Sequence, residues 1–184
     1  MAAVAMAVPG LAMAEAESYE IDTSHSFIQF RIQHLGYSWL YGAFNTFDGM
    51  FQLDRDNPEN SSIEVKIDTA SVDSNHAERD KHLRDDDFLE VEVYPEASFT
   101  STSLLLNEDG RSGVMTGDLT LRGVTKSIEI DVSMVGEGDD PWGGYRAGFE
   151  GSTVLTLKDF NVKQDLGPAS AQVEMILSIE GIRQ

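Results

Sequence analysis

The sequence contains no cysteine and few basic residues, and each shortage excludes several functions. Because none of its 184 residues is cysteine, disulfide bonds, thiolate nucleophiles and cysteine-ligated zinc are all excluded. Only 13 Lys and Arg stand against 32 Asp and Glu, which gives a formal net charge of -19. A phosphate backbone requires a basic binding surface, so we expect no nucleic-acid partner. An anionic membrane surface is disfavoured for the same reason.

Sequence motifs for catalysis and metal binding are also missing. There is no Gly-x-Ser-x-Gly elbow, Gly-rich phosphate loop or dinucleotide fingerprint, so we predict no enzyme activity and no catalytic residues. His76 and His82 are six residues apart, which on a helix turns them roughly 120° away from each other. The acidic runs 85–87 and 137–140 lack the spacing of a calcium loop. We therefore predict no metal site.

The N-terminal residues 1–14 resemble the end of a secretory signal peptide. They are uncharged and largely apolar, and they finish in Ala12-Met13-Ala14, a small-x-small cleavage pattern. The usual basic start is missing, so we interpret this segment as a signal-peptide remnant. No later stretch approaches the ~18 apolar residues of a membrane span. The sequence thus predicts a periplasmic or secreted protein, not membrane-spanning, with one folded domain over residues 15–184.

From residue 19 onward, apolar and polar residues alternate with a period of two, which is typical of half-buried β-strands. The clearest apolar sets are Ile28, Phe30 and Ile32; Ile63, Val65 and Ile67; Ile128, Ile130 and Val132; and Ala171, Val173, Met175, Leu177 and Ile179. Less regular strands are predicted over residues 41–53, 96–106, 113–121 and 145–157. One helix is predicted over residues 75–84, capped by Ser74 or Asn75.

These segments predict an all-β fold of about eight strands. Connections such as residues 107–110 and 122–123 are too short for a helical crossover, so the sheet should be antiparallel. Such strands can close into a barrel or pack as a sandwich. The interior of a closed eight-stranded barrel is either filled by its own side chains or holds one slender ligand. The residues alone leave both choices open.

Four sequence blocks occur in order over residues 19–182. The first runs from Asp22-Thr-Ser-His25-Ser26 through His34-Leu35-Gly36 to Phe47-Asp-Gly49. The second contains Ile67-Asp68, Ser71-Val72-Asp73, Arg79-Asp80-Lys-His82-Leu83-Arg84, Asp87-Phe88 and Tyr94-Pro95. The third is Gly117-Asp-Leu119-Thr-Leu121-Arg122-Gly123-Val124-Thr125-Lys126, and the fourth pairs residues 157–161 with the final strand. Together these blocks resemble the YceI-like family of bacterial periplasmic proteins.

The resemblance implies an antiparallel lipocalin-like barrel with one short helical insertion and an elongated apolar tunnel. It implies that the tunnel binds a long-chain isoprenoid, such as a long-tailed ubiquinone or a polyprenyl phosphate, and that no cofactor is required. The residues expected to line the tunnel are Ile28, Phe30, Ile32, Phe47, Phe51, Ile63, Val65, Ile67, Phe99, Leu119, Leu121, Ile128, Ile130, Leu155, Val173, Met175 and Leu177. We place Tyr37, Trp39 and Tyr41 at its mouth, because amphipathic rings can cover an apolar opening.

The sequence departs from the family pattern in the fourth block, where many relatives carry Arg-x-x-Phe-Gly. Leu157 stands in place of the Arg and Asn161 in place of the Gly, which weakens any head-group role for this segment. In the other blocks we favour structural roles over head-group contacts for four polar residues, which are His25, Arg79, Asp80 and His82.

Two classes of function remain. The first is a carrier, store or sequestering protein for an isoprenoid lipid in the cell envelope. The alternative is a secreted β-domain without a lipid ligand, which acts as an interaction or stress-response module or binds carbohydrate through Trp39 and Trp142. An exposed apolar face that includes Phe44 and Met50 leaves a homodimer open.

Overall fold

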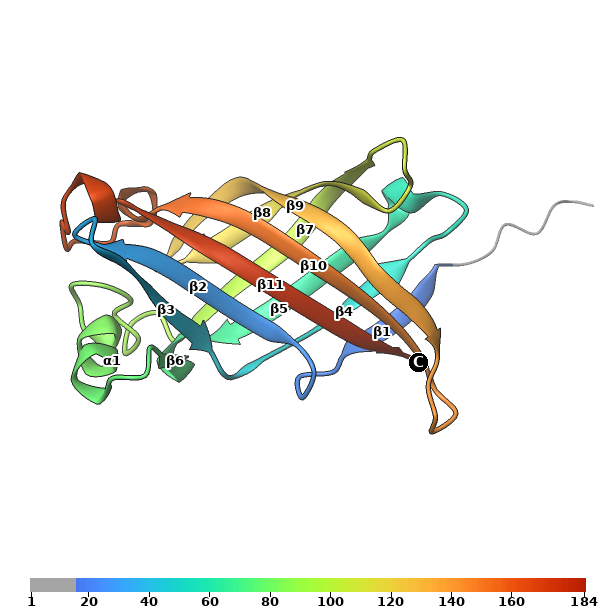
Figure 1. Ribbon diagram of the computed structural model, residues 1–184, viewed down its shortest axis with the longest axis horizontal. Helices are drawn as coiled ribbons and strands as arrows, with labels where there is room; N and C mark the ends of the chain where they lie inside the picture. The colour runs from blue at the N-terminus through green and yellow to red at the C-terminus, as the bar shows by residue number, and fades with distance from the viewer. Residues whose placement is uncertain (1–15) are drawn as a thin grey trace, which may run out of the picture.

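The alternating apolar residues form an antiparallel sheet that closes on itself (Figure 1). The computed structural model describes residues 16–184, and the cleavage site predicted at Ala14 lies outside these residues. The elements are β1 (Glu17–Ile21), β2 (Phe27–His34), β3 (Ser38–Phe44), β4 (Phe47–Leu53), β5 (Ser62–Asp68), β6 (Val72–Asp73), α1 (Ala77–Arg84), β7 (Glu96–Leu106), β8 (Ser112–Leu121), β9 (Val124–Asp139), β10 (Tyr145–Thr156) and β11 (Gln172–Arg183).

Within residues 16–184, eleven strands build a barrel that is eight strands around. The numbers differ because three barrel positions are each shared by two consecutive strands. β1 and β2 both pair with β11, one beside each end of it. On their other side, β2 pairs with β3 and β1 pairs with β4, so β3 and β4 share the next position. β5 and β6 share the position after that, because β4 pairs with β5 and β3 pairs with β6. The predicted antiparallel barrel with one helical insertion is thereby confirmed.

The strand predicted over residues 41–53 is broken in the structure. β3 ends at Phe44 and β4 begins at Phe47, so Asn45 and Thr46 lie between two strands. Phe44 lines the interior and Phe47 is buried within the barrel. These two residues are three apart, and successive side chains of a strand point to opposite faces, so one regular strand cannot turn both inward.

The helix begins later than the sequence predicted. It starts at Ala77, and His76 is the cap, because its side chain accepts a hydrogen bond from the Arg79 backbone amide. Neither predicted cap serves: Ser74 donates from its backbone amide and its hydroxyl to Asp80, and Asn75 has a φ of 63°. Within residues 16–184, no helix is long and apolar enough to cross a membrane.

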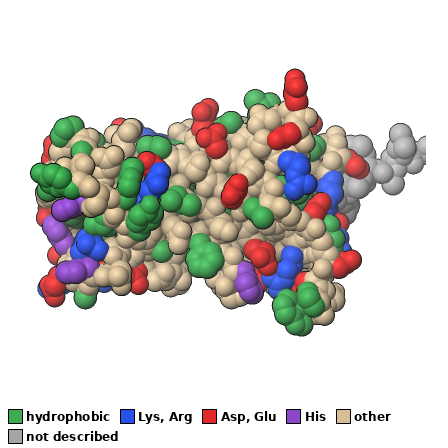
Figure 2. All heavy atoms as spheres, viewed as in Figure 1, with side chains coloured by type: hydrophobic (Ala, Val, Ile, Leu, Met, Phe, Trp, Pro, Cys, Tyr) green, Lys and Arg blue, Asp and Glu red, His purple; other side chains and the backbone are tan. Residues whose placement is uncertain are grey.

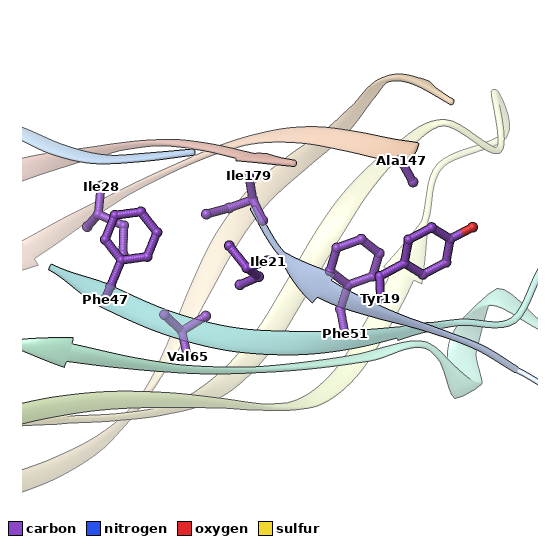
Figure 3. Packing of buried hydrophobic residues seen from close by; sticks show 8 residues of the cluster. All are labelled: Tyr19, Ile21, Ile28, Phe47, Phe51, Val65, Ala147 and Ile179. Atoms are coloured by element: carbon purple, nitrogen blue, oxygen red, sulfur yellow. The ribbon is translucent and has the colours of Figure 1, made fainter. Parts of the chain in front are cut away.

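One end of the barrel is packed by aromatic rings (Figure 3). Tyr19 stacks on Phe51 with ring centroids 4.7 Å apart, and Phe51 meets Phe149 edge-on at 5.5 Å. Arg55 covers this cluster and donates hydrogen bonds to the Tyr19 hydroxyl at 3.0 Å and to Glu137 at 2.5 Å. Burial raises the pKa of Tyr19, so its hydroxyl stays protonated inside this network.

Candidate functional site

The interior of the barrel is hollow. A cavity of about 480 Å³ runs along it and is walled by apolar side chains from most of the strands. Several inward-facing residues, among them Ile63, Ile128 and Met175, are only half-buried although they lie inside the barrel. This exposure arises because the cavity leaves their side chains accessible. The size falls within the ~300–1,000 Å³ typical of small-molecule sites.

The structure places nearly all of the predicted tunnel residues on this wall. The residues that contact the cavity are Ile28, Phe30, Ile32, Phe51, Ile63, Val65, Ile67, Phe99, Leu119, Leu121, Ile128, Ile130, Leu155, Val173, Met175 and Leu177. Phe47 is the exception. It is buried in the core cluster that also contains Ile28, beside which it lies in Figure 3, and it does not reach the cavity. That these side chains bind a ligand stays a prediction.

The three aromatic residues predicted at the tunnel mouth, Tyr37, Trp39 and Tyr41, do not line the cavity, so their predicted position is wrong. Leu40 is on the cavity wall, so its strand neighbours Trp39 and Tyr41 point to the outer face of the sheet. There Arg31 lies 4.4 Å from the centroid of the Trp39 ring. Tyr37 is 85% exposed in the turn between β2 and β3. None of the three aromatic residues contacts the cavity.

The end of the cavity nearest α1 is formed by the helix and by two end loops, residues 85–95 and 161–167. Leu83, Phe88 and Leu166 contribute apolar atoms to the wall here, and no periodic pattern in the sequence marked them. The polar side chains at this end are His34, Arg79, His82 and Gln164. Figure 2 shows histidine side chains gathered at the end of the molecule that carries α1.

Arg122 ties the two end loops to the turn between β8 and β9. Its guanidinium donates to the Asp86 carbonyl at 2.7 Å, to Glu90 Oε2 at 2.5 Å and to the Asn161 carbonyl. Arg122 is only 4% exposed and has a left-handed φ of 50°. The end loops also bond directly, because the Gln164 amide donates to the Asp87 carbonyl at 3.0 Å. These hydrogen bonds therefore hold the two end loops together at the α1 end of the cavity.

The acidic run 85–87 also helps to hold the end loops together, and it does not form an open cation site. Asp86 pairs with Lys163 at 2.9 Å, and the hydrogen bond from Lys163 holds the pKa of Asp86 below its usual range. Asp87 lies 3.1 Å from His82 Nε2. In the second run, 137–140, Glu137 to Asp139 belong to β9, and Asp140 pairs with Arg146 at 2.9 Å.

His25 and Asp80 serve the structural roles favoured for them. His25 Nδ1 lies 2.8 Å from Asp22, and hydrogen bonds from Ser24, Arg146 and His25 hold the pKa of Asp22 far below its usual range. Burial opposes ionisation of Asp80, but hydrogen bonds from Ser74 outweigh it and lower the pKa of that carboxyl. Neither His25 nor Asp80 contacts the cavity.

Asp22, His25 and Glu180 offer ligand atoms within 4.8 Å of one another, which is close enough for a metal ion. Arg146 already occupies this group, at 2.7 Å from Asp22 and 2.5 Å from Glu180. A guanidinium between the two carboxylates supplies the positive charge that a metal would bring. We interpret the cluster as an ion-pair network that joins the start of β2 to β10 and β11.

Comparisons with known proteins agree with this architecture. The family model described as YceI-like domain matches residues 19–181. A UPF0312 protein of Pseudomonas aeruginosa (strain LESB58) is 58% identical over 180 residues, covering 98% of this chain and 93% of that protein. Protein YceI of Escherichia coli O17:K52:H18 is 57% identical over 173 residues, covering 93% and 90% respectively.

A solved structure shares the fold at much lower identity. It is a polyisoprenoid binding domain from Saccharophagus degradans implicated in plant cell wall breakdown, and it is 15% identical to this chain with a TM-score of 0.65. The match covers 91% of this chain and 99% of that domain. At this identity the comparison concerns the fold alone.

Proposed function

The chain belongs to the YceI-like domain family, and from this premise we propose that its barrel binds a long-chain isoprenoid lipid. The observation that carries the proposal is the cavity of about 480 Å³ with an almost wholly apolar wall. A prenyl chain gains about 0.8 kcal/mol for each methylene-sized group that it buries. A sugar or amino acid would lose its hydrogen bonds to water on the same wall.

The isoprenoid class, as distinct from other long-chain lipids, is supported by the fold shared with the polyisoprenoid binding domain from Saccharophagus degradans. A long-tailed ubiquinone and a polyprenyl phosphate both fit the proposal. The protein would act as a carrier, store or sequestering protein in the periplasm, with no catalytic step. The apolar residues 1–14 that end in Ala12-Met13-Ala14 support the export on which this location depends.

Extraction of the purified protein with organic solvent, followed by mass spectrometry, tests the proposal. Wild-type protein should release a prenyl lipid. Met175→Trp adds volume on the cavity wall and should lower the extracted lipid severalfold, whereas Ile176→Trp, on the outer face of the same strand, should leave it unchanged. Both variants should unfold at nearly the wild-type urea concentration. The hollow interior has room for the ring of Met175→Trp, and the ring of Ile176→Trp lies on the outer face of the strand.

Two outcomes would contradict lipid binding. One is wild-type protein that yields no prenyl lipid from its native host. The other is a Met175→Trp variant that retains the wild-type amount of lipid but loses about 1–3 kcal/mol of stability, as overpacking of a filled core would cause. Either result would favour the alternative of a β-domain that has no lipid ligand.

A further inference from the structure

Charged side chains are scarce on the cavity wall, and their placement is asymmetric. In the described part of the chain, the only arginines on the wall are Arg79 and Arg111, and the only carboxylate is Glu150. Arg79 lies on α1, at one end of the cavity. Arg111 lies in the turn between β7 and β8. Glu150 borders the cavity near the same end, but its exposed side chain accepts a hydrogen bond from Ser133 of β9 on the outer face of the sheet. Among the wall residues, the α1 end therefore carries an arginine and no carboxylate.

Arg79 is held in place by neutral partners. Its Nε donates to Ser74 Oγ at 2.7 Å, and one terminal nitrogen donates to the Ser74 carbonyl. Most other arginines of this acidic chain pair with carboxylates, as Arg31 does with Glu174 at 2.6 Å. Over residues 16–184, no carboxylate lies within ion-pair distance of Arg79. The nearest link is indirect, through Ser74 Oγ to Asp80.

We propose that the α1 end of the cavity binds an anionic phosphoryl head group, with Arg79 as its charged contact and the hydrocarbon chain running inward. This inference rests on the proposed lipid function. Leu83, Phe88 and Leu89 surround the site, and the low dielectric constant of such surroundings strengthens a charge-assisted hydrogen bond. The planar guanidinium matches the geometry of phosphate oxygens better than an ammonium would.

The opposite end of the cavity suits an anion less well. Arg111 is exposed and donates to the Met134 carbonyl at 3.3 Å, so water weakens its attraction for a ligand. His34, His82 and Gln164 add possible donors beside Arg79. The chain would then extend from Arg79 toward the packed rings of Phe51 and Phe149.

The test compares two lipids that differ only in the head, geranylgeranyl phosphate and geranylgeraniol. Affinities are measured by calorimetry with delipidated full-length protein, the matched variants Arg79→Gln and Arg111→Gln, and Arg79→Lys. Wild-type protein should bind the phosphate at least about tenfold more tightly, as one charge-assisted hydrogen bond allows. Arg79→Gln should abolish this preference without changing geranylgeraniol binding, Arg79→Lys should retain part of it, and Arg111→Gln should retain all of it.

The outcomes separate this inference from the function on which it rests. If wild-type protein binds neither lipid, the proposed function fails and the head-group site fails with it. If wild-type protein binds both lipids equally, or if only Arg111→Gln removes the preference, lipid binding stands and the site at Arg79 is wrong. A second measurement needs no variant: added NaCl should weaken binding of the phosphate and leave geranylgeraniol unaffected. Equal salt dependence of the two lipids would contradict the charged contact.

Discussion

Three glycines face phenylalanine rings from other strands, and these contacts shape the inner surface of the barrel. The pairs are Gly42 with Phe30, Gly117 with Phe99, and Gly181 with Phe51. A Cβ added at Gly42 would lie only 2.3 Å from Phe30 Cζ, and the other two pairs are equally tight. A strand glycine often marks such a close approach. Each ring occupies the space that a side chain at the glycine would take.

We expect Gly42→Ala to displace the Phe30 ring and to reduce the room in the cavity. The free energy of unfolding, measured in urea, should fall by about 1–3 kcal/mol because the Asp73 carbonyl blocks relaxation on the other side. The lipid extracted from the variant should also fall. Gly136→Ala is the matched control, since a Cβ on that strand residue meets nothing within 4 Å. Equal stability of the two variants would show that the Phe30 ring moves freely.

At the scale of strands, the alternation of apolar residues predicted most of the barrel. β7 has the predicted bounds, and β8 and β10 differ from theirs by one residue at one end. The breaks within shared barrel positions were missed, although a signal for them was present. Inward residues have odd numbers in β1, β4 and β5 and even numbers in β2, β3 and β6, as Ile21 and Ile28 illustrate. A change of parity marks each break.

The same parity explains the error over the mouth aromatics. Inward residues of β3 have even numbers, as Leu40 and Phe44 do, so Trp39 and Tyr41 had to face outward. The end loops are different, because no local pattern could have predicted them. Arg122 bonds to residues 32 to 39 positions away in the chain, and its partners are mainly backbone carbonyls, which every residue possesses.

Arg122→Leu should loosen both end loops and destabilise the fold. Its hydrogen bonds join a buried cation to Glu90 and to two carbonyls, and loss of a bond to a charged group costs about 1.5–3 kcal/mol. Urea unfolding should show at least that loss, and amide hydrogen exchange should accelerate over residues 85–91. Lys126→Gln provides the control, because its 3.3 Å pair with Asp159 is exposed and contributes at most about 1 kcal/mol. Unchanged amide hydrogen exchange in Arg122→Leu would contradict the role of Arg122 in holding the end loops together.

At the scale of the whole molecule, the formal net charge is -19, and Asp and Glu side chains are scattered over the face drawn in Figure 2. The few cations of the chain are concentrated in networks that hold distant segments together. Arg55 joins Glu17 of β1 to Glu137 of β9, and Arg146 of β10 joins Asp22 to Glu180 of β11. Two carboxyls of these networks have lowered pKa values, since a hydrogen bond from Arg55 stabilises ionised Glu17 and several stabilise ionised Asp22. Barrel closure is therefore linked to pH.

The sign of this linkage predicts acid sensitivity. A carboxyl whose pKa is lower in the folded state than its unfolded value near ~4 stabilises the fold fully above that value. The contribution is lost as pH falls from ~4 through the folded pKa, because the unfolded chain takes up protons in this range that the folded network does not bind. The free energy of unfolding in urea should therefore be lower at pH 3 than at pH 5. Asp22→Asn should cost about 1.5–3 kcal/mol at pH 7, where the charged hydrogen bond to Arg146 is lost.

Asp22→Asn also separates the effect of the Asp22 carboxyl on stability from the effect of the other acidic residues. General repulsion among carboxylates relaxes as pH falls toward the isoelectric point near 4.3, and wild-type protein and Asp22→Asn share that change. The difference in stability between them should consequently be constant above pH 5 and should shrink between pH 4 and pH 2, as Asp22 takes up a proton in the unfolded wild-type chain while it stays ionised in the folded one. A difference that stays constant down to pH 2 would mean that Asp22 does not hold β2, β10 and β11 together through its charge.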